Sequence, residues 1–177
     1  MSNLNETVSA ERVHIAFFGR RNAGKSSLVN AVTGQELSVV SDVLGTTTDP
    51  VKKAMELLPI GPVMIIDTPG FDDEGELGEK RVEKTREILA KTDVAVLVVD
   101  AKEGAGDAER QFLSVVTEKK LPCITVFNKT DIAVAPVLRE NEIAVSAKEK
   151  IGINELKELI GSLAKMQKIR AELLVTS

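Results

Sequence analysis

An eight-residue segment, Gly19 to Ser26, carries the residue types that bind a chain of phosphates. Its sequence, GRRNAGKS, fits the pattern G-x-x-x-x-G-K-S/T and lies between an apolar run at 13–18 and a helix-like stretch. Gly19 and Gly24 would let the backbone turn its N–H groups around a diphosphate, where the helix N-terminus adds positive charge. Lys25 would then reach the β- and γ-phosphates, and Ser26 would bind Mg²⁺. The predicted phosphate site also takes in Asn22, Ala23 and Ser27.

Two further segments have residue types suited to the terminal phosphate. Asp67 follows the apolar run 63–66 and opens the sequence DTPG. Its carboxylate can hold a water of Mg²⁺, and the N–H of Gly70 can contact a γ-phosphate that disappears on hydrolysis. Three threonines at 46–48 lie in a long loop, where one hydroxyl could complete the Mg²⁺ shell while the γ-phosphate is bound. The alternative is a polar loop in which none of the three touches metal.

Two segments near the C-terminus could read a guanine base. Asn128–Asp131, NKTD, ends the strand ITVF, and Ser146–Lys148, SAK, ends the strand EIAV. The Asp131 carboxylate can accept hydrogen bonds from guanine N1–H and the exocyclic amino group, whereas adenine offers it no donor at N1. We expect this carboxylate to be buried, so leaving it unpaired should favour GTP over ATP by on the order of 10³-fold or more. The remaining roles expected are base stacking by the Lys129 stem, a tie to the phosphate loop from Asn128, and a hydrogen bond to guanine O6 from the Ala147 N–H.

These motifs need a scaffold in which strands and helices alternate. The pattern predicts strands at 13–18, 51–58, 63–66, 94–99, 122–127 and 142–145, and helices at 25–33, 79–91, 107–119 and about 153–166. Residues 34–50 and 68–78 are expected to be mobile loops, 59–62 a turn whose prolines break strand pairing, and 132–140 a short helix or turn. Such an order implies a mostly parallel sheet that binds ligands at the carboxyl ends of its strands.

Composition limits the class of protein. The 177 residues suffice for one domain, and with 43% hydrophobic but only 3% aromatic residues the core must be aliphatic. A net charge of −4 without a Lys/Arg block argues against nucleic-acid binding by this domain alone. The polar first twelve residues and the short apolar run 94–99 indicate a cytoplasmic protein with no membrane segment. Cys123 and His14 are the only residues of their types, so we expect no disulfide, zinc or iron–sulfur site, and a buried rather than reactive Cys123.

Taken together, the five motifs resemble the Era/TrmE branch of the translation-factor-type P-loop GTPases over nearly the whole chain. The resemblance implies an α/β P-loop NTPase fold, three-layer and doubly wound, with a mostly parallel six-stranded sheet and one antiparallel edge strand. In that branch the threonine two residues after the loop glycine is the metal ligand, which is Thr47 here. The resemblance thus gives Ser26, Thr47 and Asp67 as Mg²⁺ ligands, and Lys25, Thr47 and Gly70 as catalytic residues.

More narrowly, residues 41–73 resemble the GTPase domain of the di-iron hydrogenase maturation family, HydF. Era-type proteins usually carry Arg after two threonines, whereas Thr48 stands here, followed by Asp49-Pro50-Val51. The HydF family adds dimerisation and iron–sulfur domains, which this chain does not contain. We therefore expect a flexible arm at 1–12, the GTPase domain at 13–166 and a helix extension or linker at 167–177. GTP is the expected partner, with hydrogenase maturation proteins bound through the absent domains, and a homodimer is left open.

The residue after Gly70 is Phe71, where Ras-like enzymes place the glutamine that orients water. A phenyl ring cannot do this by hydrogen bonding, so hydrolysis needs another route. The carboxylates that could position water, unless they simply form a solvated loop, are Asp72, Asp73, Glu74, Glu76 and Glu79. Asn22 could help hold a monovalent cation beside the phosphates, and GTPases of this branch with Asn there often use potassium. The alternative is that Asn22 only tolerates an unusual turn dihedral.

The function expected is a slow, potassium-stimulated, Mg²⁺-dependent GTPase that acts as the switch domain of a hydrogenase maturation scaffold. Two alternatives stay open. One is a GTP-gated docking module in which binding, rather than hydrolysis, is the working step. The other is a ribosome- or RNA-associated GTPase of the same branch, against which the negative net charge counts.

Overall fold

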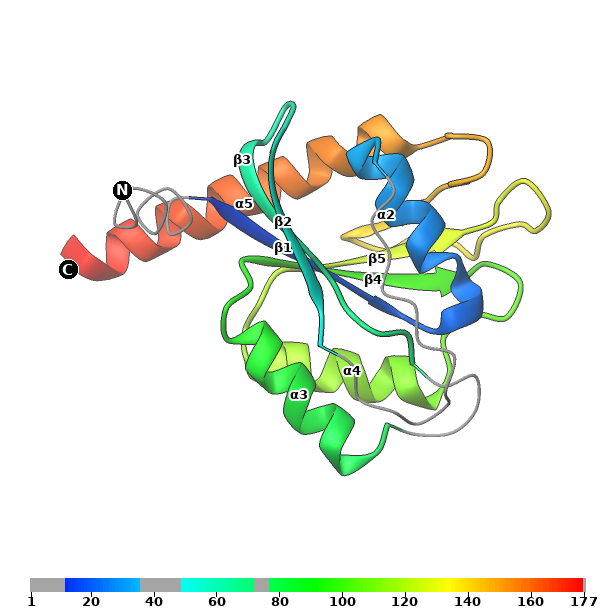
Figure 1. Ribbon diagram of the computed structural model, residues 1–177, viewed down its shortest axis with the longest axis horizontal. Coiled ribbons are helices and arrows are strands. Elements are labelled where there is room, and N and C mark those ends of the chain that lie inside the picture. Colours follow the sequence, from blue (N-terminus) through cyan, green and yellow to red (C-terminus); the bar gives the residue numbers. More distant parts are fainter. Residues whose placement is uncertain (1–11, 36–48, 72–76, 177) are drawn as a thin grey trace.

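The protein alternates strands and helices, which form one sheet covered by helices on both faces (Figure 1). The structure is a computed structural model that describes residues 12–35, 49–71 and 77–176. Its strands are β1 (Val13–Gly19), β2 (Val51–Leu57), β3 (Gly61–Asp67), β4 (Val94–Asp100), β5 (Cys123–Asn128) and β6 (Glu142–Ala144). Its helices are the short 3-10 helix η1 (Arg21–Ala23), α2 (Lys25–Thr33), α3 (Glu79–Leu89), α4 (Asp107–Glu118) and α5 (Ile153–Thr176).

The sheet has the strand order β2-β3-β1-β4-β5-β6, and every neighbouring pair is parallel except β2 and β3. A turn at 58–60 is enough to join the antiparallel pair, whereas β4 and β5 are reached through the crossover helices α3 and α4. The α/β class, the six strands and the antiparallel edge strand are therefore confirmed. Because the parallel strands point the same way, their carboxyl ends share one edge of the sheet, where Gly19, Asp67, Asp100 and Asn128 lie.

Alternate side chains of the central strands enter two separate cores. Ile15 and Phe17 of β1 pack into the core beneath α2 and α5, and Ala16 and Phe18 pack into the core beneath α3 and α4. Figure 1 shows these two pairs of helices on opposite faces of the sheet. The two-residue period of the strands thus produces the three layers.

Strand β3 begins earlier than the sequence indicates. Pro62 was expected to break pairing, yet it pairs with Glu56 of β2 in the antiparallel ladder. The parallel ladder with β1 begins one residue later, at Val13 and Val63. Pro62 therefore lies near the start of the strand, where its missing N–H costs the ladder little.

The C-terminal part of the chain also differs in detail. Residues 130–132 form a turn, but 134–139 contain neither helix nor strand, because Pro136 disfavours helical geometry at the residue before it. Helix α5 does not end near residue 166 but continues to Thr176, so 167–176 are helical rather than an irregular linker. The other boundaries lie within about two residues of those expected from the sequence.

Cys123 begins β5 and is partly buried against the core beneath α3 and α4. Burial raises the pKa of its thiol to about 12, which keeps it protonated and unreactive at neutral pH. Within the described ranges, the helices are all too short or too polar to cross a bilayer.

Several sequence predictions lie outside the described residues. These are the N-terminal arm except Arg12, residues 36–48 of the first predicted loop with Thr47, and residues 72–76 with four of the five candidate carboxylates. The fifth, Glu79, is exposed at the start of α3.

Candidate nucleotide-binding site

The predicted phosphate loop connects β1 to α2 through two glycines with positive φ. Gly19 has φ 155°, and a Cβ there would meet the carbonyl of Val98 on β4. Gly24 has φ 84°, and a Cβ there would collide with the side-chain nitrogen of Asn128. Only glycine fits both positions, and the helix N-terminus then begins at Lys25, facing the carboxyl edge of the sheet.

Lys25 and Asp67 form a buried ion pair at the base of this loop. Their side chains are 3% and 0% exposed, and the Lys25 ammonium donates to Asp67 Oδ1. Burial lowers the pKa of Lys25, and the charge and hydrogen bond of Asp67 oppose that shift. The ion pair thus holds side by side the two residues predicted to meet the phosphates and the Mg²⁺ water.

The segment Asp67–Phe71 is held against the phosphate loop. The Thr68 hydroxyl donates to the Phe17 carbonyl at 2.6 Å, and the Phe71 N–H donates to the Gly19 carbonyl at 2.7 Å. A Cβ on Gly70 would lie 2.8 Å from Cγ of Arg21, so only glycine allows this approach. The backbone N–H of Gly70 is thereby kept next to the loop that would hold the phosphates.

Phe71 is a core residue. Its side chain is 1% exposed, and its ring centroid lies 5.9 Å from that of Phe112 on α4. The residue that replaces the water-orienting glutamine thus anchors the turn by packing and cannot reach a water on the phosphate.

Asn128 links three segments through its side chain. Its Nδ2 donates to the Ala23 carbonyl in the phosphate loop at 2.9 Å, which is the tie expected from the sequence. Its Oδ1 accepts the Ala147 N–H at 3.0 Å, the donor expected to face guanine O6. Both bonds are buried, so Asn128 fixes the phosphate loop and the SAK segment relative to each other.

Asp131 lies at the open side of this arrangement. Its Oδ1 accepts the Ser146 hydroxyl at 2.9 Å, but the carboxylate is exposed. The sequence argument treated it as buried, and that is wrong for the protein alone. The preference for guanine can arise only in a complex, where the base itself covers the carboxylate.

Lys129 reaches back to the phosphate loop. With φ 74°, its ammonium donates to the Asn22 carbonyl and lies 3.1 Å from Asp100 Oδ2. Burial would raise the pKa of Asp100, but hydrogen bonds from Lys129 and the N–H groups of Lys102 and Glu103 hold it below its ordinary value. Asp100 therefore stays ionised and positions Lys129.

Asn22 itself is exposed in η1, and it is not among the described non-glycine residues with positive φ. The alternative that it serves only an unusual dihedral is therefore wrong. Of the remaining predicted site residues, Ser26 is half-buried in the first turn of α2, and Ser27 and Lys148 are exposed.

Sequence reasoning missed two residues that support the site, Glu109 and Asp100. The Arg20 guanidinium donates to both carboxylate oxygens of Glu109, at 2.9 and 3.2 Å, and Glu109 is 1% exposed. Glu109 also accepts the Gly106 N–H at 3.0 Å at the start of α4. Glu109 lies three residues after Gly106, at the spacing expected of an acid that caps a helix N-terminus. This spacing could have identified Glu109 from the sequence. The second missed residue is Asp100, an acid at a strand end of the same edge.

The residues present fit a nucleotide with Mg²⁺. The loop backbone forms a cradle whose glycines leave no room for a Cβ, and a buried lysine lies at its base. Ser26 and Asp67 offer the hard oxygen ligands that Mg²⁺ prefers, directly or through water, while Thr47 is outside the described residues. When bound, Mg²⁺ would neutralise charge on the β- and γ-phosphate oxygens.

A phosphate loop, an Asp-x-x-Gly turn and an Asn-Lys-x-Asp segment on one edge of such a sheet define a P-loop GTPase domain. The sequence profile of the family described as "50S ribosome-binding GTPase" matches residues 14–129. The chain belongs to this family, which places it among the TrmE/Era/Der-type GTPase domains.

Individual relatives agree with this assignment. The chain is 32% identical over 169 residues to "tRNA modification GTPase MnmE" of Desulforamulus reducens, covering 90% of this chain and 36% of the relative. It is 38% identical over 136 residues to "GTPase Der" of Sulfurimonas denitrificans, covering 75% of this chain and 27% of the relative. A crystal structure of Aquifex aeolicus Era bound to GDP and AlF4⁻ matches with a TM-score of 0.68 and 26% identity, over 85% of this chain and 56% of that one. The chain spans about a third of the length of the first curated relatives.

Proposed function

We propose that this chain is the cytoplasmic switch domain of a longer protein, and that it binds GTP with Mg²⁺ and hydrolyses it slowly. The observation that carries the proposal is the Asn128 side chain, which donates to the Ala23 carbonyl and accepts the Ala147 N–H and so joins the phosphate loop to the segments expected to read guanine. The phosphate loop and Asn128 lie 105 residues apart in the sequence, and the sheet brings them to one edge, where a single nucleotide could contact both.

Different groups of the chain would bind the phosphates, the Mg²⁺ and the γ-phosphate. Backbone N–H groups from Asn22 to Ser26 and the Lys25 ammonium would bind the phosphates, while Ser26, Thr47 and Asp67 would hold Mg²⁺. The N–H of Gly70 would bind the γ-phosphate and would lose that contact after hydrolysis. Catalysis would then rest on positioning and charge stabilisation by these groups, because Phe71, in the place of the glutamine, is buried in the core.

The base site would be formed by a second set of residues. Asp131 would accept the guanine donors, and the stem of Lys129 would lie on the ring. The Ala147 N–H donates to Asn128 Oδ1 in this structure, so in the complex it would be shared between Asn128 Oδ1 and guanine O6. Ser146 would keep Asp131 in position through its hydroxyl, and Lys148 completes the segment. The test is a competition assay in which GTP, but not ATP, displaces a fluorescent guanine nucleotide. Equal displacement by ATP would contradict the assignment.

We propose further that hydrolysis is stimulated by potassium held near Asn22. The side chain of Asn22 is exposed beside the phosphate cradle, and its backbone carbonyl already accepts a hydrogen bond from Lys129, so the side-chain amide oxygen is the group we assign to the cation. Turnover should be several-fold faster in KCl than in NaCl at equal ionic strength. Asn22→Ala should lose that difference and keep its affinity for GTP. Equal rates of the unmutated chain in both salts would remove the potassium site.

For the longer protein we propose a role in di-iron hydrogenase maturation. The support is the resemblance of residues 41–73 to the HydF family, including Thr48 in place of the usual arginine. Lys25→Ala introduced into the native gene should abolish hydrogenase activity, and the unaltered gene should restore it. Full hydrogenase activity in cells carrying the variant would exclude this role and leave the GTPase assignment intact.

Whether binding or hydrolysis does the work can be decided separately. In a docking module, a non-hydrolysable GTP analogue alone releases or recruits the partner. In a hydrolysis-driven switch, the analogue holds the partner in one state and only turnover changes it. Partner dissociation measured beside steady-state turnover separates these two mechanisms.

A ribosome- or RNA-associated role is the second candidate, and the comparisons favour it. One relative carries the name "tRNA modification GTPase MnmE", the matching family is described as "50S ribosome-binding GTPase", and an Era structure with 25% identity contains 16S ribosomal RNA. Co-sedimentation of the full-length protein with ribosomes, in GTP but not in GDP, would support this candidate. No co-sedimentation in either nucleotide would count against it.

A further inference from the structure

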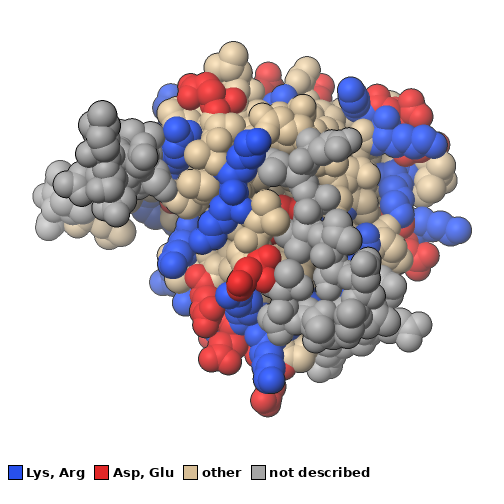
Figure 2. Space-filling model, viewed as in Figure 1, with Lys and Arg blue, Asp and Glu red and all other residues tan. Residues whose placement is uncertain are grey.

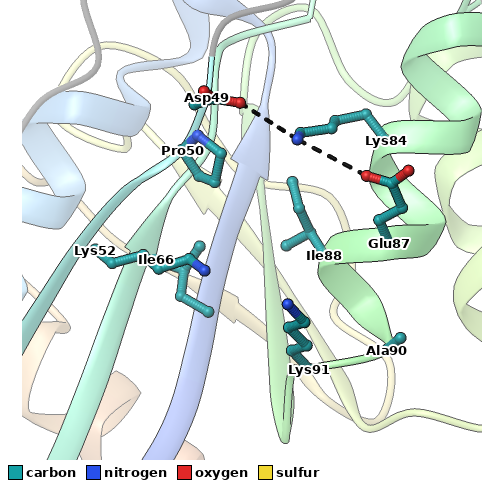
Figure 3. Close-up of a pocket in the computed structure, with 9 residues that line it drawn as sticks. All are labelled: Asp49, Pro50, Lys52, Ile66, Lys84, Glu87, Ile88, Ala90 and Lys91. Carbon is teal, nitrogen blue, oxygen red and sulfur yellow. Dashed lines mark hydrogen bonds and ion pairs between the residues drawn. The ribbon is translucent and has the colours of Figure 1, made fainter.

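A pocket of about 520 Å³ lies between the β2–β3 edge of the sheet and helix α3 (Figure 3). Its apolar part is made by Pro50 just before β2, Ile66 on β3, Ile88 on α3 and Ala90 just after α3. None of the predicted phosphate or guanine residues lines it. The volume is in the range of roughly 300 to 1,000 Å³ found for small ligand sites.

The rim of this pocket carries more positive than negative charge. Lys84 lies between Asp49 and Glu87, with nitrogen–oxygen distances of 3.3 and 3.8 Å (Figure 3). Lys52 and Lys91 are exposed at the rim, and neither has an ion-pair partner among the described residues. Three lysines thus face two carboxylates, in a chain whose net charge is −4.

Figure 2 shows basic side chains running across this face in the region of β2, next to a group of acidic ones. A charged edge strand by itself has a simple explanation, because lysines on an edge discourage pairing with another sheet. That explanation covers Lys52 on β2, but it does not cover Lys91, which follows α3, or the apolar residues between them. One explanation is therefore needed for both the local positive charge and the apolar residues that line the base of the pocket.

We propose that this pocket binds an acidic peptide segment of a partner protein. One aliphatic or aromatic side chain of the segment packs on the half-buried Pro50 and Ile88, above the buried Ile66. Carboxylates on either side pair with Lys52 and Lys91. Charge complementarity selects an acidic partner, and the apolar floor selects a peptide over RNA, since a sugar–phosphate backbone has no apolar side chain to insert. The pocket lining also contains no aromatic residue on which a base could stack.

The pocket is lined by described residues that flank both predicted loops in the sequence. Asp49 and Pro50 directly follow residues 36–48, and α3 follows residues 72–76. The Asp49–Lys84 ion pair already joins these two elements across the pocket. A bound segment would add to that link. The binding itself does not depend on the GTPase proposal and can fail or succeed separately from it.

The test is a methyl NMR titration of the whole chain with short capped peptides. Acetyl-Glu-Phe-Glu-amide should cause saturable shifts of the Ile66 and Ile88 methyl signals. Acetyl-Gln-Phe-Gln-amide should bind about fivefold more weakly, because it lacks both charges. Acetyl-Glu-Ala-Glu-amide should also bind more weakly, because it buries little apolar surface.

Charge-reversal variants supply the controls. Lys52→Glu/Lys91→Glu should abolish the shifts, and the milder Lys52→Gln/Lys91→Gln should weaken binding even if the reversal variant fails to fold. Lys165→Glu/Lys168→Glu makes the same charge change at exposed positions of α5 and should bind as the unmutated chain does. No saturable shift at Ile66 and Ile88, equal binding of the Gln peptide, or unchanged binding to both Lys52/Lys91 variants would overturn the proposal. Stronger shifts of the same methyls with an octauridylate RNA would overturn it in favour of a nucleic-acid site.

Discussion

Replacing Asn128 by alanine should damage the protein before any nucleotide is bound. The change removes the bond to the Ala23 carbonyl at 2.9 Å and the bond from the Ala147 N–H at 3.0 Å. Each leaves a backbone group without its buried partner, at a cost of about 1 to 3 kcal/mol. Water can reach part of the space that opens, so we expect a total loss of about 2 to 4 kcal/mol in the free energy of unfolding. In a chain of this size that lowers Tm by about 5 to 15 °C.

The same variant should weaken GTP and GDP to a similar degree, by about tenfold or more, because it releases the phosphate loop and the SAK segment from each other. Asn128→Asp should be nearly as harmful. It keeps an acceptor for the Ala147 N–H but places a carboxylate oxygen against the Ala23 carbonyl.

Urea unfolding without nucleotide and fluorescence titration with labelled GDP measure the two effects. Asn154→Ala is the matched control, because Asn154 is exposed on α5 and should change neither quantity. An unfolding free energy for Asn128→Ala within about 0.5 kcal/mol of the unmutated chain would refute the reasoning, since that is the scatter of neutral surface changes.

Three further outcomes are expected. Lys25→Ala should reduce GTP affinity and turnover by well over tenfold, because it removes a charge from a water-poor site; filter binding and phosphate release measure this, and unchanged values would reject the phosphate-loop assignment. Asp131→Asn should weaken GTP and improve xanthosine triphosphate, since the amide can donate to the 2-oxo group of xanthine; a competition assay that still ranks GTP far higher would show that Asp131 does not read the base. Asp100→Asn should destabilise the chain at pH 7 by about 1 to 3 kcal/mol, through weaker bonding to Lys129. Because folding lowers the pKa of Asp100, the difference in stability between the variant and the unmutated chain should be fully present above pH 3.8, the ordinary pKa of the carboxyl. The difference should vanish as the pH falls through the lower pKa of the folded state. A difference in urea unfolding that does not change with pH would contradict this account.

The parts of the site that depend on local backbone geometry could be predicted from the sequence. Gly24 and Gly34 enclose helix α2 at the expected residues, because both have the positive φ that ends or precedes a helix. Asn128 was expected to meet the phosphate loop because both follow parallel strands. Strand-end motifs are brought together by topology alone.

The parts that depend on packing between distant elements could not be predicted. The Arg20–Glu109 ion pair joins residues 89 positions apart, and it exists because α4 crosses beneath the phosphate loop. The exposure of Asp131 depends on the distance between its loop and the core. The spacing of residues in the sequence does not determine that distance. The pocket beside α3 likewise brings Lys52 and Lys91 together from separate elements, although no basic run appears in the chain.

The two cores on either side of the sheet support different parts of the nucleotide site. Ala23, Leu28 and Val29, behind the phosphate loop, pack in the core shared with α5, whereas Phe71 packs with Phe112 in the other core. Substitutions that weaken packing in the core under α5 would therefore first change the affinity for nucleotide. Loosening the core around Phe112 would first change how the Asp-x-x-Gly turn is seated, and with it the response to the γ-phosphate. Substitutions in the two cores would thus act first on different parts of the site, although the Lys25–Asp67 ion pair and the Phe71–Gly19 hydrogen bond still connect those parts.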